Sequence, residues 1–327
     1  MKKNFWEKLK DTGRPILALA PMAGFTDTAF RQICAKQGAD VLYSEMASVT
    51  ALHYYATAKK PERDNGGKVT LELLRFNRRL EKNYVIQLFG STPEHFATAA
   101  QVVSQKIKPD GIDINFGCPA GKVLKQGAGA DLMKDLKRSR AVIKAVLDNT
   151  DLPVSIKLRA KSGEVGVLEF LDNISDLPVA AVMIHGRTLA QGFAGAPDFK
   201  IVKEARQHFK GVLLANGGIN NLNDAKIALL ASGADGFGLA RGVLGRPWLF
   251  NEIKNNKELN ISPKEILKLM LKHAILAVKL KGEGMMLELR KHLVWYVQSF
   301  PGASRLRSEL VTVSSLADVK KIVKKHS

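Results

Sequence analysis

Hydrophobic runs of strand length alternate with amphipathic segments over most of the chain. Between residues 15 and 240, each short apolar run is followed by a longer segment with apolar residues at helical spacing. Eight strands are predicted, over residues 15–20, 40–45, 84–89, 111–116, 153–158, 179–185, 211–216 and 234–240. Several intervening segments begin with residues typical of a helix start, including Pro93, Asn221 and Asn223. Eight consecutive βα units predict an α/β fold, a closed (β/α)8 TIM barrel, in preference to an open doubly wound sheet.

Two regions depart from this alternation. Residues 58–83 are charged and too long for an ordinary connection between strands, and we expect a surface hairpin there. After residue 250 the segments ISPKEILKLMLKHAILAVKLKG, MMLELRKHLVWYVQSF and LADVKKIVKK predict amphipathic helices. The expected organisation is a barrel domain over residues 1–250 and a small C-terminal all-α helical bundle over residues 251–327.

Composition narrows the class of protein. The chain of 327 residues is 46% hydrophobic with 27 glycines, which fits a compact enzyme. The first residues lack the apolar segment of a signal peptide, and no apolar stretch approaches the length of a membrane span. We therefore predict a cytoplasmic protein that does not associate with a membrane. The segment ILKLMLKHAILAVKL could also lie on a membrane surface, although a helical bundle would bury the same apolar stripe.

The cysteine inventory is small. Cys34 and Cys118 are the two cysteines of the sequence, which supports neither a disulfide framework nor a thiolate metal site, and no metal is expected. Cys34 lies within a helical pattern and is expected to be buried packing.

The chain is strongly basic. Its formal net charge is +19 and its pI is about 9.8, which points to an anionic macromolecule as partner, either nucleic acid or a membrane surface. From residue 251 onward, 15 Lys and Arg face 7 Asp and Glu, a net charge of +8. The predicted C-terminal helices are therefore the more basic part.

Polar residues recur at the ends of the predicted strands. In PVSIKLR, the apolar Val154, Ile156 and Leu158 are expected to face the helices. The same parity turns inward a polar set made of Gln87, Asn115, Ser155, Lys157, Arg159 and His185. One such residue is more often structural, but unpartnered inward polar groups cost about 1–3 kcal/mol each. Four strands ending this way predict a polar planar ligand at the C-terminal mouth of the barrel.

The predicted seventh and eighth strands end in the glycine-rich segments ANGGIN and GLARGVLGRPW. Barrel loops at these positions often bind phosphate, because glycine lets backbone amides approach the anion. Gly217, Gly218, Arg241 and Gly242 fit this role. The predicted ligand is a planar ring joined to a phosphate, as in FMN.

Cys118 follows the fourth predicted strand between Gly117 and Pro119, so its sulfur should overhang the barrel mouth. A thiol, with a reference pKa of about 8.5, is mostly protonated at neutral pH and can donate a proton. The alternative is a small buried hydrophobe, the commoner fate of a free cysteine.

With these residues in hand, the chain resembles the tRNA-dihydrouridine synthases over nearly its full length. The matching segments are LAPMAGFTDTAFR, SEMAS, IQLFGSTPEHFATAA, DINFGCPAGKV, SIKLR, IHGRTLAQGFAG, NGGI, ARGVLGRPWLF, RKHLVWY and FPGASRLRSEL. The resemblance implies FMN-dependent reduction of the double bond between carbons 5 and 6 of a uridine in tRNA. NADPH or NADH would reduce the flavin first.

The resemblance also implies roles for individual residues. The residues expected to hold FMN are Pro21, Met22, Ala23, Gln87, Asn115, Lys157, His185, Asn216, Gly217, Gly218, Ala240 and Arg241, with Asn115 added from the strand-end argument. Cys118 would protonate carbon 5 of a flipped-out uridine, and Lys157 would stabilise negative charge on the reduced flavin. The expected contacts to tRNA phosphates are Lys122, Arg159, Arg187, Arg290, Lys291, Arg305 and Arg307.

Several positions depart from the family pattern. Gly218 stands where an acidic residue is usual, Ala240 where glycine is usual and Gly121 where lysine is usual, and residues 160–166 lack a Thr-Gly-Trp segment. These departures concern the substrate loops and the choice of uridine. Two other functions stay open: an FMN barrel acting on a free pyrimidine or other small enone, and an RNA-binding protein without catalysis. No obligate protein partner is evident, and a monomer is expected.

Overall fold

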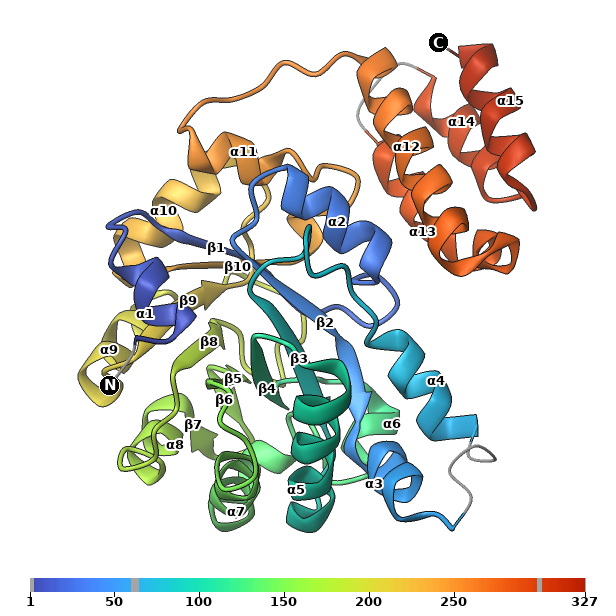
Figure 1. Cartoon of the computed structure of the whole chain (residues 1–327). Coiled ribbons are helices and arrows are strands. Elements are labelled where there is room, and N and C mark those ends of the chain that lie inside the picture. Colours follow the sequence, from blue (N-terminus) through green and yellow to red (C-terminus); the bar gives the residue numbers. More distant parts are fainter. Residues whose placement is uncertain (1–2, 60–64, 299–301, 327) are drawn as a thin grey trace.

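Eight parallel strands close into a barrel in the computed structural model, which describes residues 3–59, 65–298 and 302–326. The strand order around the barrel is β1-β10-β9-β8-β5-β4-β3-β2 (Figure 1). The strands are β1 (Ile16–Leu19), β2 (Val41–Ser48), β3 (Tyr84–Phe89), β4 (Gly111–Phe116), β5 (Val154–Arg159), β8 (Ala181–His185), β9 (Val212–Asn216) and β10 (Gly236–Leu239). The predicted TIM barrel is confirmed, with every predicted strand in place.

Helices follow each strand and form the outer layer (Figure 1). They are α2 (Thr28–Lys36), α3 (Val49–Thr57), α4 (Asn65–Leu73), α5 (Pro93–Val102), η2 (Val103–Ile107), α6 (Gly121–Leu124), η3 (Leu132–Lys134), α7 (Leu136–Leu147), α8 (Val167–Asn173), α9 (Lys200–His208), α10 (Leu222–Ser232), η4 (Arg241–Val243) and α11 (Leu249–Lys254). Polar residues at the helix starts satisfy free backbone amides: Asn221 caps α10 by accepting from the Asp224 amide. A short hairpin of β6 (Lys161–Ser162) and β7 (Val165–Gly166) lies in the segment that departs from the family pattern.

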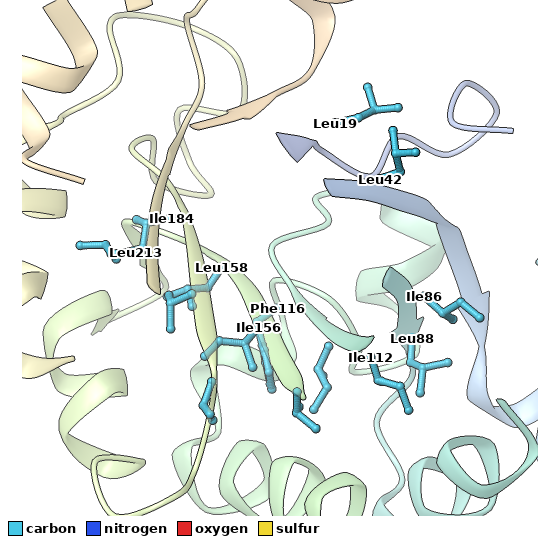
Figure 2. Packing of buried hydrophobic residues seen from close by; sticks show 14 of the residues in the cluster. Leu19, Leu42, Ile86, Leu88, Ile112, Phe116, Ile156, Leu158, Ile184 and Leu213 are labelled. Carbon is cyan, nitrogen blue, oxygen red and sulfur yellow. The ribbon is translucent and has the colours of Figure 1, made fainter. Parts of the chain in front are cut away.

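The barrel has an outer and an inner apolar layer. Side chains such as Ile86, Ile156 and Leu158 point outward and fill the space between strands and helices (Figure 2). A separate cluster fills the lower interior, where Trp6 of α1 (Phe5–Lys10) joins Tyr43 of β2 and residues of β1, β3, β8 and β9. Because this plug closes the bottom, the inward polar residues are left at the upper, C-terminal mouth.

The expected surface hairpin at residues 58–83 is wrong for the residues that the structure describes. Residues 65–73 form helix α4, which packs against α3. Gly67 explains the close approach, because a Cβ there would lie 2.2 Å from Cβ of Tyr55. The alternating letters VTLEL suggest a strand, but this contact between two helices decides the local structure. Residues 60–64 of the predicted hairpin lie outside the described residues.

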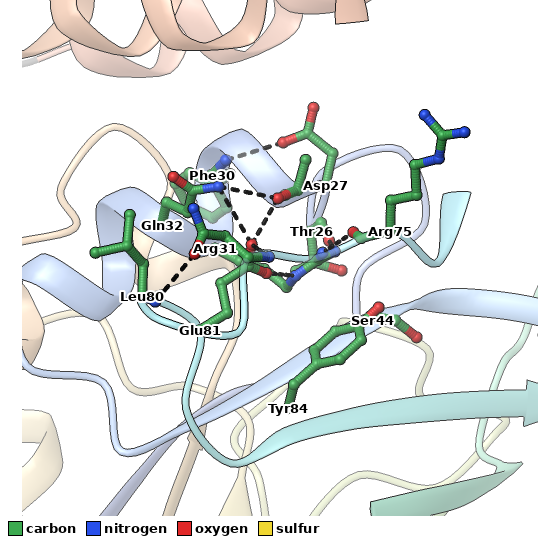
Figure 3. Close-up of polar contacts among 12 residues, drawn as sticks. Thr26, Asp27, Phe30, Arg31, Gln32, Ser44, Arg75, Leu80, Glu81 and Tyr84 are labelled. Atoms are coloured by element: carbon green, nitrogen blue, oxygen red, sulfur yellow. Dashed lines mark hydrogen bonds and ion pairs between the residues drawn. The ribbon is translucent and has the colours of Figure 1, made fainter. Parts of the chain in front are cut away.

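A buried ion pair fastens the end of this segment to the barrel (Figure 3). Arg31 of α2 donates through Nε to Glu81 over 2.5 Å, and both side chains are fully buried. The remaining donors of Arg31 reach the carbonyl oxygens of Thr26 and Arg75, each at 2.7 Å. Thr28 donates to the other carboxylate oxygen over 2.6 Å. Because both charges are fully bonded, this network holds the loop before β3 against α2.

The C-terminal helices enclose a core of their own. They are α12 (Pro263–Lys281), η5 (Glu283–Met285), α13 (Met286–Tyr296), α14 (Ala303–Leu310) and α15 (Leu316–His326). Their cluster runs from Leu267 to Val323 and takes in Ala29 of α2 from the barrel. Helix α11 spans the predicted boundary at residue 250, and the division into domains 1–250 and 251–327 stays a prediction. No described helix combines the length and apolar character that crossing a membrane requires.

Candidate active site

Polar side chains from neighbouring strands meet in one layer at the mouth of the barrel. The parallel pairing sets Gln87 beside Asp113, Asn115 beside Lys157, and His185 beside both Arg159 and Asn216. Above this layer lies a cavity of about 400 Å³. Its lining includes all the residues expected to hold FMN: Pro21, Met22, Ala23, Gln87, Asn115, Lys157, His185, Asn216, Gly217, Gly218, Ala240 and Arg241. Of the residues that strand parity turns inward, Ser155 does not line this cavity, whereas the others do, and their role toward FMN stays a prediction.

A chain of hydrogen bonds joins the barrel interior to Cys118. Asp113, fully buried, accepts from Gln87 Nε2 over 2.7 Å and from Ser155 Oγ over 2.6 Å. Gln87 Oε1 in turn accepts from Asn115 Nδ2 over 2.7 Å. Asn115 Oδ1 then accepts the backbone amides of Gly117 and Cys118 over 3.0 and 2.9 Å. Each amide side chain thus has one orientation, and the last one fixes the turn that carries the thiol.

The thiol itself lies at the cavity wall. Cys118 is half-buried and lines the cavity, whereas Cys34 is fully buried in the outer core, as expected. The Cys118 carbonyl accepts the Ala130 amide over 3.1 Å. Gly129, at φ +62°, permits this contact, because a Cβ there would lie 2.9 Å from the same carbonyl oxygen. The turn is held from both sides, which fixes where the sulfur lies.

Burial and charge set the ionisation of the cavity floor. Burial raises the pKa of Asp113 to about 6, although bonds from Ser155 and Gln87 and the nearby Lys157 oppose the shift. Burial, followed by the charge of Arg159, lowers the pKa of Lys157 to about 8. At pH 7 Asp113 is therefore mostly an anion that only accepts hydrogen bonds, and Lys157 is mostly a cation.

His185 is neutral in this surrounding. Burial is the largest cause that lowers its pKa to about 2, and the charges of Lys157, Arg159, Arg187 and Arg241 add to it. Arg187 Nη1 lies 3.3 Å from His185 Nε2. Because arginine only donates, Nε2 is the acceptor and Nδ1 carries the proton.

The cavity fits a flavin mononucleotide. Gly217, at φ +103°, stands against His185, and a Cβ there would lie 2.5 Å from His185 Cδ2, so glycine keeps this part of the wall open. Gly218 also has a positive φ, and the Arg241 guanidinium lies 4.3 Å from the ring centroid of Phe193. Among the described residues, no carboxylate lines the cavity. Amides, cations and open glycine backbone are what a planar heterocycle with a phosphate requires.

The residues expected to contact tRNA phosphates are spread more widely. Arg159 and Arg187 line the cavity, but their guanidinium groups bond to carbonyl oxygens, including those of Gly117 and Gly195 at 2.9 Å each. Arg290 and Arg307 likewise donate to carbonyls, of Val313 and Val297. Lys291 lies 5.2 Å from the Phe25 ring, and Lys122 and Arg305 are exposed. Their roles toward tRNA stay predictions.

Several lining residues are absent from the predicted set: Phe25, Met46, Phe193, Asn220, Leu244 and Trp295. Met46 lies on β2 beyond a register shift, so simple alternation does not place it. Trp295 comes from α13, which no rule about barrel strands reaches. Phe193 had a signal, an aromatic residue in the glycine-containing segment TLAQGFAG.

Comparison with known proteins gives the family. The family model described as dihydrouridine synthase matches residues 18–326. The chain belongs to the dihydrouridine synthase family. It is 32% identical to the probable tRNA-dihydrouridine synthase 1 of a Synechocystis species, over 93% of this chain and 84% of that protein. It is also 32% identical to tRNA-dihydrouridine synthase B of Vibrio vulnificus, over 89% of each chain. The predicted family and enzyme class, an FMN-dependent oxidoreductase, are confirmed.

Solved structures similar to this dihydrouridine synthase family member support the fold. The structure of TcOYE with pHBA matches 77% of this chain and 92% of that chain, with a TM-score of 0.50 and 12% identity. Histamine dehydrogenase from a Rhizobium species matches 86% of this chain and 49% of that chain, with a TM-score of 0.53 and 13% identity. At these identities the likeness concerns the barrel alone.

Proposed function

We propose that this protein is a tRNA-dihydrouridine synthase that binds FMN in the cavity at the barrel mouth and reduces one flipped-out uridine. The observation that supports it best is the fixed position of Cys118 beside a cavity that has a layer of polar strand-end residues at its floor and is large enough for a flavin. The basic surface of the chain, with its formal charge of +19, suits a polyanionic substrate. The monomeric state and the cytoplasmic location stay predictions.

In this proposal the twelve predicted residues that line the cavity hold FMN. FMN held there would supply, once reduced by NADPH or NADH, a hydride for carbon 6 of the uridine. Cys118 Sγ gives its proton to carbon 5 and regains one from solvent, so that both atoms of the former double bond gain hydrogen. The Lys157 ammonium group stabilises negative charge at the floor of the cavity. His185 is neutral and adds no charge of its own.

The roles of Cys118 and its surroundings are separable by mutation. Cys118→Ala should keep its flavin and its affinity for tRNA, yet lose about 10²–10⁴-fold in the rate of dihydrouridine formation, because only the acid is removed. Absorbance of the flavin, a tRNA-binding titration and dihydrouridine mapping measure the three quantities. Cys118→Ser tests the same step with a group that donates a proton less readily. Loss of flavin from either variant would mean that Cys118 serves the structure instead.

A comparison of substrates tests the alternative of a small-molecule FMN enzyme. The enzyme should reduce uridine in whole tRNA and not free uridine, and the reaction should weaken as salt rises. Free uridine reduced as well as tRNA, independently of salt, would favour the small-molecule enzyme. A colourless protein that takes up no flavin would contradict both.

A further inference from the structure

A second cavity borders the first and has no role in the function proposed above. Its volume is about 490 Å³, which is sufficient for a nucleotide. Five lining residues are shared by the two cavities: Asn220, Arg241, Gly242, Leu244 and Trp295. A nucleotide next to one held in the first cavity can therefore reach the second.

Three segments build most of this second cavity, and two of them belong to the C-terminal part of the chain; Asn220 from the loop after β9 and Ile266 of α12 complete the lining. The loop after β10 supplies residues 241–248, the connection to α12 supplies residues 259–263, and the end of α13 supplies residues 295–298. Gly245 lets loop and helix touch, because its φ is +67° and a Cβ there would lie 2.1 Å from the Trp295 carbonyl oxygen. The cavity thus forms only where the barrel and the C-terminal helices meet.

The lining has the chemistry of a nucleotide site. Trp248, which is 8% exposed, and the half-buried Trp295 contribute aromatic side chains to the lining, and Asn220, Asn260 and Gln298 offer amide groups for the edge of a base. Arg246 is paired with the buried Glu252 over 2.8 Å, whereas for Arg241 no ion pair occurs among the residues described. No acidic residue lines the cavity in the described ranges. The lining therefore carries no negative charge toward an anion, and Arg241, which borders both cavities, stays assigned to FMN.

We infer that this second cavity holds a nucleotide that flanks the target uridine in the RNA strand. The inference rests on the proposed function. A uridine that leaves its stack to enter the first cavity leaves a neighbouring base without a stacking partner, and the two tryptophans lie where that base would pass. The C-terminal segment supplies about half of the lining, all of it uncharged, while the net charge of +8 from residue 251 onward belongs to its other residues and suits the approach of a polyanion.

A double-perturbation experiment tests this inference. In tRNA whose modified uridine has been mapped, the nucleotide on either side is replaced by an abasic residue. In the protein, Ile261→Trp fills the second cavity from the half-buried linker, and Gln298→Ala removes an exposed amide from its rim. Ile227→Trp, at a position 54% exposed on α10, is the matched control for an added tryptophan.

The abasic residue at one of the two neighbouring positions should by itself weaken tRNA binding to the holoenzyme about tenfold, and so should either protein substitution by itself. Both together should weaken binding little further, since they remove the same contact. Reduction of the flavin by NADPH without tRNA should be unchanged in each variant. Effects of Ile261→Trp and the abasic residue that simply multiply would overturn the inference, as would slower flavin reduction with unchanged tRNA binding. If the wild-type enzyme forms no dihydrouridine in tRNA, the proposed function fails; multiplying effects in an active enzyme count against the second cavity alone.

Discussion

At the scale of single residues, Asp113 decides which way two amide side chains point. Its ionised carboxylate can only accept, so Gln87 presents Nε2 to it and turns Oε1 toward Asn115. Asn115→Asp would set a carboxylate oxygen against Gln87 Oε1, two acceptors without a proton between them. We expect a loss of about 1–3 kcal/mol in the free energy of unfolding at pH 8. The loss should shrink toward pH 5, where a protonated carboxyl can donate to Gln87.

A second substitution distinguishes this explanation from general damage. In the double variant Asp113→Asn with Asn115→Asp, the direction of the hydrogen bonds along positions 113, 87 and 115 reverses. The new amide at position 113 donates to Gln87 Oε1, and Gln87 Nε2 donates to the new carboxylate at position 115, which still accepts the amides of Gly117 and Cys118. The double variant should recover most of the lost stability in urea denaturation. Asn255→Asp, at an exposed position, is the control and should change little. A double variant less stable than Asn115→Asp alone would contradict the proposed direction.

Which residues line the cavity was partly predictable from the sequence. Strand alternation gives Lys157, Asn115 and His185, because a side chain on a barrel strand has two directions to choose from. The same parity also turns Asp113 inward, two positions before Asn115, but a sequence does not show that Gln87 and Ser155 meet its carboxylate. Partners across strands depend on register, which a single sequence leaves undetermined.

At the scale of elements, one glycine controls the contact between the loop after β10 and α13. Gly245→Ala should lower the free energy of unfolding by several kcal/mol, because the new methyl group would meet the backbone of Trp295 and Tyr296, which cannot rotate away. Gly282→Ala is the matched control: its φ is +81°, but a Cβ at this position would meet no described atom within 4 Å. It should cost about 1–3 kcal/mol, the conformational penalty of its backbone region (φ +81°, ψ 172°) alone.

Thermal and urea denaturation of the two variants measure the difference. Equal losses would mean that the contact at Gly245 relaxes at little cost. A further readout is tRNA affinity, which Gly245→Ala should lower and Gly282→Ala should leave unchanged, since the first borders the second cavity.

Helices and strands were predicted well where the hydrophobic pattern is strong, and less well where tertiary contacts determine the local structure. The strands over 84–89 and 111–116 match the structure residue for residue, because each is a continuous apolar run with clear ends. Residues 65–73 were not predicted as a helix, since the charge and length of the whole segment 58–83 suggested a surface hairpin. Packing of Gly67 on Tyr55 overrides that local preference.

At the scale of the whole molecule, the barrel and the C-terminal helices meet at a buried cluster of ionisable groups. His273 of α12 and His292 of α13 lie with ring centroids 4.9 Å apart and contact Phe30 of α2. The other charged or titratable groups that influence them are Asp27, Lys281, Lys291 and Tyr296, and Glu45 interacts in turn with Asp27 and the two lysines. Nε2 of each histidine has no hydrogen-bond partner within the described part of the chain. The two histidine rings are therefore packed as apolar groups, and protonating them in the folded protein costs free energy.

This cluster predicts that acid weakens the molecule at the junction. Burial, its largest cause, lowers the pKa of His273 to about 4 and, helped by the charge of His273, that of His292 to about 3. The unfolded chain binds protons at these residues near pH 6.5, whereas the folded chain does not, so stability is complete above pH 6.5 and is lost as pH falls toward 4. Each histidine should contribute a loss of about 2 kcal/mol between pH 6.5 and 5.

His292→Phe isolates one of these contributions, because it keeps an aromatic ring against Phe25 and Phe30 and removes the nitrogens that titrate. At pH 7.5 the variant should be at least as stable as the wild type, since one buried nitrogen without a partner in the described ranges is gone. Between pH 6.5 and 5 its free energy of unfolding should fall less steeply, by about 1 kcal/mol per pH unit on average. The pKa of Asp27 is lowered, so this carboxylate titrates below the range. The pKa of Glu45 is raised, which has the opposite effect on stability, but Glu45 is present in both proteins. Neither group therefore alters the difference between the two stability curves. Parallel curves for wild type and His292→Phe would show that His292 is protonated in the folded junction as readily as in the unfolded chain.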